Sequence, residues 1–148
     1  MIVAITGSRV VSLQGREKIH RIMKEVVEDR NVKAIRFGGA EGSDTIALEA
    51  ALLTRKGTKP KLTVLLPNRL SDQPTETHNI TLRADEVIEL GRHITSGDGF
   101  QSYHLRNDDL IHPANVVVAF WNGKDASGTL SVIRKAGKAQ KKLRTVII

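Results

Sequence analysis

Three short segments of the chain combine glycine with hydroxyl or charged side chains, and each one follows an apolar run. They cover residues 7–9, 38–44 and 127–129. Glycine lets a ligand come close to the main chain, and the N-terminus of a helix carries free N–H groups that attract anions. The pattern therefore predicts a phosphate site. Its candidate ligand-binding residues are Gly7, Ser8, Arg9, Gly38, Gly39, Ala40, Gly42, Ser43, Asp44, Ser127, Gly128 and Thr129.

Ordinary helix capping is the alternative interpretation of these segments. Serine and aspartate are common N-cap and turn residues, so Ser43, Asp44 and Ser127 could do nothing more than cap helices. Three such segments together favour a ligand site over capping alone. The chain has neither a G-x-G-x-x-G motif after its first strand nor a Walker lysine motif, which disfavours NAD binding and P-loop ATPase chemistry.

The elements that must position these segments follow from the hydrophobic pattern. Several strand-like runs are apolar without alternation, as in strands that are covered on both faces. Helical spacing of apolar residues separates them, for example at Ile19, Ile22, Met23 and Val26. This alternation predicts one three-layer α/β domain over residues 1–148, Rossmann-like, with a mostly parallel sheet. The expected strands cover residues 2–6, 32–37, 61–66, 86–90, 115–120 and 144–148, and a polar loop is expected over 68–79.

In a sheet of this kind ligands bind beyond the carboxyl ends of the strands, so polar residues near those ends are further candidates. Arg106 and Asn107 lie in a polar cluster before the fifth predicted strand, and we assign them to the site or to its support. A solvated helix face with Arg106 in an ion pair is the alternative. Trp121 directly follows that strand and could stack on a base or pack at the rim.

Composition limits the classes of function. The chain has 148 residues, no cysteine and a net charge of +7, which favours phosphorylated or polyanionic partners. Its five histidines show no His-x-x-x-His pair, so we predict no metal site. There is no basic-then-apolar leader at Met1 and no apolar run long enough to span a membrane, and we therefore expect a cytoplasmic protein without membrane contact.

Three of these motifs resemble the superfamily called SLOG, which joins DNA processing protein A (DprA) with the Lonely Guy (LOG) phosphoribohydrolases. The run "GGAEGSD" is similar to the DprA-type glycine turn, "RN" at Arg106 and Asn107 to the R-N pair, and "SGT" at residues 127–129 to the S-G-T that opens a helix. The resemblance implies a Rossmann-like fold that binds a nucleotide, a nucleotide-derived signal or nucleic-acid phosphate, frequently as a dimer. It implies no certain cofactor.

One position departs from the LOG pattern. LOG enzymes carry a catalytic glutamate three residues after the threonine of G-G-x-G-T, and this chain has Val132 there. Valine offers neither a proton nor a charge to assist the departure of a base. The resemblance therefore does not carry LOG-type hydrolysis to this chain unless Glu41, Asp44 or Asp125 substitutes, and no catalytic residue is assigned. We favour a nucleotide-binding module, and two alternatives stay open: a DprA-like binder of single-stranded nucleic acid, and a hydrolase or transferase acting on a nucleoside phosphate.

Overall fold

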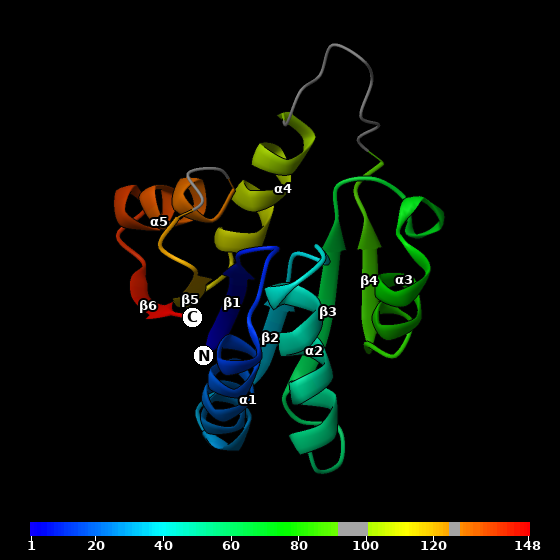
Figure 1. Cartoon of the computed structure of the whole chain (residues 1–148), viewed down its shortest axis with the longest axis vertical. Coiled ribbons are helices and arrows are strands. Elements are labelled where there is room, and N and C mark those ends of the chain that lie inside the picture. Colours follow the sequence, from blue (N-terminus) through cyan, green and yellow to red (C-terminus); the bar gives the residue numbers. More distant parts are fainter. Residues whose placement is uncertain (92–100, 125–127) are drawn as a thin grey trace.

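Strands and helices alternate along the whole of the chain that the computed structural model describes, which is residues 1–91, 101–124 and 128–148 (Figure 1). The strands are β1 (Ile2–Gly7), β2 (Ala34–Phe37), β3 (Lys61–Leu66), β4 (Glu86–Glu89), β5 (Val116–Trp121) and β6 (Lys142–Ile147). The helices are α1 (Leu13–Glu28), α2 (Ser43–Thr54), the 3-10 turn η1 (Leu70–Asp72), α3 (Thr75–Thr81), α4 (Gln101–Ile111) and α5 (Gly128–Lys138).

The six strands form one sheet in the order β4-β3-β2-β1-β5-β6. Every strand pair in the described residues is parallel, where the sequence predicts a mostly parallel sheet. The loops that follow β1, β2, β3 and β5 therefore lie at one edge, which we call the carboxyl edge. Strand order reverses between β1 and β5, and such a reversal opens a crevice at that edge in Rossmann-like sheets.

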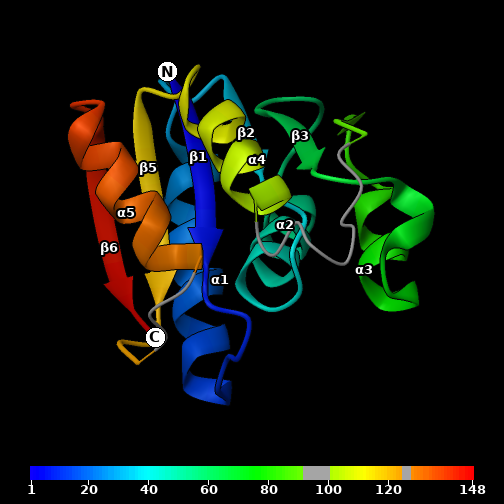
Figure 2. The same cartoon turned by 90° about the horizontal axis from the view of Figure 1, so that it is seen from above.

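Helices cover both faces of the sheet. Figure 2 shows α4 and α5 in front of the strands and α1 and α2 behind them. Along β1, Val3 and Ile5 belong to the core beneath α1 and α2, whereas Ala4 belongs to the core beneath α4 and α5. All three residues are buried, which explains why the strand is apolar without alternation. The predicted three-layer architecture is confirmed.

Helix α1 shows how a surface helix of this fold is specified. Ser12 caps it, because its Oγ accepts a hydrogen bond of 3.0 Å from the amide of Gly15. The apolar residues at helical spacing, among them Ile19 and Met23, are buried against the sheet as predicted. None of the described helices is both long and apolar enough to cross a bilayer.

Several predicted boundaries differ by one or two residues from the structure, and three differences bear on the site or on the sheet. The segment 68–79 is not a loop, because it holds η1 and α3; its polar residues lack the apolar periodicity by which helices are recognised. Gly7 is the last residue of β1 and pairs with Phe120, rather than lying in the following turn. Strand β6 begins at Lys142, two residues earlier than predicted, because pairing with β5 extends the ladder into a charged segment.

Candidate functional site

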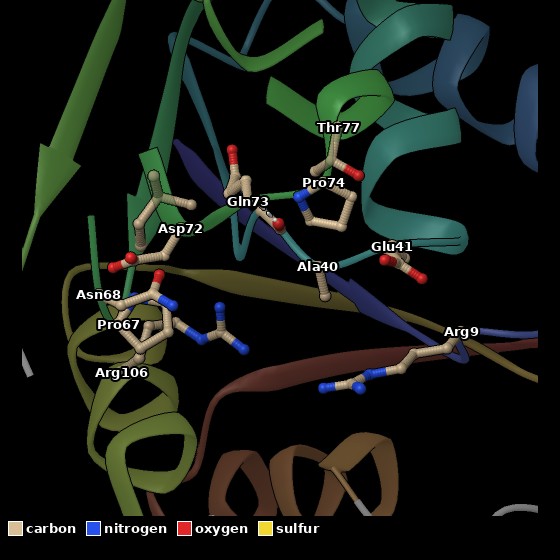
Figure 3. Close-up of a pocket in the computed structure, with 12 residues that line it drawn as sticks. Arg9, Ala40, Glu41, Pro67, Asn68, Asp72, Gln73, Pro74, Thr77 and Arg106 are labelled. Carbon is tan, nitrogen blue, oxygen red and sulfur yellow. Dashed lines mark hydrogen bonds between the residues drawn. The ribbon is translucent and has the colours of Figure 1, made fainter. Parts of the chain in front are cut away.

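A small cavity lies at the carboxyl edge, where the loops after β2 and β3 meet residues of the β1 loop and of α4 (Figure 3). Its volume is about 90 Å³. Arg9, Gly39, Ala40 and Arg106 are the residues lining it that the sequence predicts as site residues. The other lining residues are Glu41, Leu66, Pro67, Asn68, Asp72, Gln73, Pro74 and Thr77.

Two arginines dominate the charge of this cavity. Figure 3 shows the guanidinium groups of Arg9 and Arg106 pointing toward each other across it. Arg9 is exposed in the loop that follows β1, two residues after the strand ends, whereas Arg106 is 6% exposed and reaches the cavity from α4. Arg106 donates hydrogen bonds to the carbonyl oxygen of Gly38 and, over 2.9 Å from its Nε, to Oδ1 of Asn107. The alternative of a solvated face for Arg106 and Asn107 is therefore wrong, because both residues are buried.

The glycines after β2 are required by the fold itself. Gly39 has φ 72° and Gly42 has φ 81°, a backbone conformation that L side chains rarely adopt. A Cβ on Gly39 would lie 2.4 Å from Cδ2 of Leu66, and one on Gly42 would lie 2.1 Å from the carbonyl oxygen of Arg9. Both glycines are thus needed for the packing of this turn, and their use for the approach of a ligand stays a prediction.

Gly7 and Gly38 are constrained in the same way by neighbouring chain segments. A Cβ on Gly7 would lie 2.4 Å from Cβ of Ser43, and one on Gly38 would lie 2.8 Å from Oδ2 of Asp44. The close approach that the glycine cluster indicates is thus real. The groups that come so close to these glycines are the side chains of Ser43 and Asp44, at the start of α2.

Ser8 and Ser43 join the loops of the carboxyl edge to one another. The amide of Ser8 donates to Phe120 over 2.8 Å, and the amide and hydroxyl of Ser43 donate to the carbonyl oxygen of Ser8 over 3.0 and 2.7 Å. Oγ of Ser8 accepts from the amide of Asn122 over 3.0 Å. Both serines are buried and outside the lining of the cavity, where they hold together the loops that form it; direct ligand contact by either serine stays a prediction.

Asp44 is a buried carboxylate beside these groups, at the start of α2. Its side chain is 4% exposed, and Oδ2 accepts a hydrogen bond of 3.1 Å from the amide of Ala40. Oδ1 is buried and has no hydrogen-bond partner in the described part of the chain. Burial raises the pKa of Asp44 from 3.8 to about 6, and the charge of Arg106, the Ala40 amide and Arg9 oppose that rise.

The raised pKa of Asp44 predicts a pH-dependent stability. Because the folded carboxyl group holds its proton more tightly than the unfolded one, the folded state binds more protons between pH 3.8 and about 6. The contribution of Asp44 to the free energy of unfolding should therefore fall by about 3 kcal/mol as the pH rises through this window. Urea unfolding of the wild type and of Asp44→Asn from pH 4 to pH 7 measures it. A wild-type minus variant difference that does not change with pH would contradict the assignment.

The third predicted segment lies at the same edge but not in this cavity. Gly128 begins α5 and is exposed, and Thr129 is buried. Ser127 lies outside the described residues. Trp121, at the end of β5, is partly exposed and does not line the cavity. The starts of α2 and α5 lie at the same edge of the sheet, although the two helices cover opposite faces.

Three positions besides Asp44 bear on catalysis. Val132 is fully buried in the core between α5 and the sheet, where it contributes to packing and not to the cavity. Glu41 is exposed and lines the cavity. Asp125, the other carboxylate considered as a substitute, lies outside the described residues.

The sequence interpretation missed the contribution of the segment after β3. Asn68, Asp72, Gln73 and Thr77 line the cavity, and Nε2 of Gln73 donates to the carbonyl oxygen of Gly39 over 2.7 Å. The available signal was their position, because the segment follows a parallel strand at its carboxyl end just as the glycine segments do.

Several solved structures share this fold. Over 98% of its length, the chain matches DNA processing protein A from Helicobacter pylori, with 28% identity and a TM-score of 0.75. It matches DprA from Streptococcus pneumoniae with 20% identity and a TM-score of 0.76, and the Moco carrier protein from Chlamydomonas reinhardtii with 17% identity and a TM-score of 0.63. These matches confirm the Rossmann-like fold, and the match to the Helicobacter pylori protein confirms the resemblance to the SLOG superfamily.

DNA processing protein A from Helicobacter pylori binds single-stranded DNA in a unique mode. The present chain spans 64% of the length of that protein, 49% of the Streptococcus pneumoniae protein and 75% of the Moco carrier protein. No family model and no curated protein matches the chain.

Proposed function

We propose that the chain is a binding module whose carboxyl-edge cavity holds the phosphate group of a nucleotide-type ligand. The observation that carries the proposal is the pair of guanidinium groups, from Arg9 and Arg106, that face each other across the cavity. Guanidinium groups form charge-assisted, often bidentate hydrogen bonds with phosphate oxygens. The glycine segments support the proposal by bringing main chain and α2 to the same point.

The size of the cavity supports a phosphate as the group held there. Pockets that enclose drug-sized molecules measure about 300–1,000 Å³, and this one measures about 90 Å³. A single anionic group matches it, and the remainder of a nucleotide would extend beyond it. Protonation of Asp44 below about pH 6 removes a negative charge near this group.

Replacing Arg9 by glutamine tests this function directly. Arg9 is exposed, so the change should alter the free energy of unfolding by less than about 0.5 kcal/mol. It removes a charge-assisted contact of about 1.5–3 kcal/mol, so the affinity for adenosine monophosphate should fall by about 10- to 100-fold. Isothermal titration calorimetry measures it, with the exposed α1 residue Arg21→Gln as the matched control. Equal affinity in wild type and Arg9→Gln would rule the cavity out as the phosphate site.

A second candidate function is the binding of single-stranded nucleic acid. The fold shared with the Helicobacter pylori protein and the net charge of +7 favour it. A strand held through several phosphates should lose affinity steeply as salt rises. Titration of an oligodeoxythymidylate at 50 and 200 mM salt tests this: a loss of affinity no greater than that of the mononucleotide would exclude a multi-phosphate contact.

A further inference from the structure

We propose that the groove between α2 and α3 binds the nucleoside part of a single nucleotide whose phosphate occupies the cavity at the carboxyl edge. This proposal rests on the proposed phosphate site and adds the place and chemical character of the rest of the ligand. The groove has a volume of about 690 Å³ and is lined by residues of both helices and by Arg16 of α1. Arg9, Glu41, Pro74 and Thr77 line both the groove and the cavity, so the two spaces adjoin.

The charge of the groove differs in sign from that of the whole chain. Its charged lining residues are two arginines, Arg9 and Arg16, and three glutamates, Glu41, Glu49 and Glu76, which leaves a net charge of −1. The chain as a whole carries +7. Successive phosphates of a nucleic-acid strand along this groove would meet the carboxylates and be repelled by them. The groove therefore disfavours a strand and suits an uncharged group.

The lining of the groove fits a nucleoside in two further respects. Carboxylates accept hydrogen bonds, and the ribose hydroxyls and the amino group of adenine are donors. Ile46, Pro74 and Ile80 add an apolar surface against which the face of a base can pack. A ligand with its charge at one end and donors on a flat ring at the other matches the cavity and the groove together.

The experiment compares inorganic phosphate, adenosine monophosphate and an oligodeoxythymidylate by calorimetry on the full chain. Asn79 is exposed on α3 and lines the groove, so Asn79→Trp fills the groove with little demand on the core. Leu53→Trp, at a position on α2 that is 68% exposed and outside the lining, is the matched control. We expect wild type and Leu53→Trp to bind adenosine monophosphate at least tenfold more tightly than phosphate. In Asn79→Trp the two affinities should become equal while that for phosphate stays unchanged.

The outcomes distinguish a failure of the groove proposal from a failure of the proposed phosphate site on which it rests. If Asn79→Trp binds both phosphate and adenosine monophosphate as the wild type does, the groove proposal is wrong and the phosphate site stands. If the oligonucleotide binds wild type as tightly as adenosine monophosphate and Asn79→Trp abolishes both, the groove holds a strand and the proposal is again wrong. If the wild type binds neither phosphate nor adenosine monophosphate, the proposed function fails together with the groove.

Discussion

Arg106→Met is expected to lower the free energy of unfolding by about 3–5 kcal/mol at pH 7.5, because it breaks a buried charged network from one side. The guanidinium group of Arg106 donates to Gly38 and Asn107 and attracts the buried carboxylate of Asp44. Without it, the pKa of Asp44 should rise further above its usual range, so at pH 7.5 the folded protein must either bury an unpaired carboxylate or take up a proton at Asp44, and both lower the free energy of unfolding. Urea denaturation followed by circular dichroism measures the loss.

The pH and a second substitution test that explanation. At pH 5 the carboxyl group of Asp44 is largely protonated in the folded protein, so the loss caused by Arg106→Met should be smaller there than at pH 7.5. Adding Asp44→Asn should recover part of the stability at pH 7.5, because no charge is then left buried. An equal loss at both pH values, with no recovery in the double variant, would show that Arg106 acts only through hydrogen bonding and packing.

Gly42→Ala is expected to cost on the order of 3–5 kcal/mol, which corresponds to a fall in Tm of roughly 10 °C. The alanine would adopt φ 81°, and its Cβ would lie 2.1 Å from the carbonyl oxygen of Arg9 and 2.5 Å from the carbonyl carbon. The β1 loop and the start of α2 would have to separate. Thermal unfolding followed by circular dichroism provides the measurement.

Gly57→Ala is the matched control for that substitution. Gly57 has φ 75°, but a Cβ there meets no atom within 4 Å, so only the backbone strain remains, about 1 kcal/mol. The difference between the two variants isolates the contact between Gly42 and Arg9. Similar losses in both would mean that this close approach relaxes without cost.

The fold could be predicted from the sequence because each buried strand is a short apolar run that is visible in the sequence alone. β1 and β5 are continuously apolar, and Ile19 and Met23 repeat at helical spacing in α1, so the alternation of elements is visible without tertiary information. Helix α3 could not be found in this way. It is short and polar, and it is helical because it packs beside α2 at the end of the sheet.

The candidate site was predicted only at the level of segments. The glycine pattern located the turn between β2 and α2. The space beside Gly39 is filled by Leu66 and the space beside Gly42 by Arg9, and both residues lie far from the turn in the sequence. The roles of Ser8 and Ser43 likewise depend on hydrogen bonds across the sheet. The residue types predicted a polar site at this edge. The direction in which each side chain points depends on contacts between distant segments, which only the folded structure shows.

The hydrogen bonds made by Ser8 have a consequence for how a ligand would be received. They connect the loop after β1 to α2 and to the end of β5. These hydrogen bonds hold Ser8 against Ser43 and Asn122 before any ligand enters, so less conformational entropy is lost at these residues on binding. Such preorganised sites change little in backbone on binding. Any signal that binding sends to another molecule would then be carried by exposed side chains such as Arg9, and not by a rearrangement of the sheet.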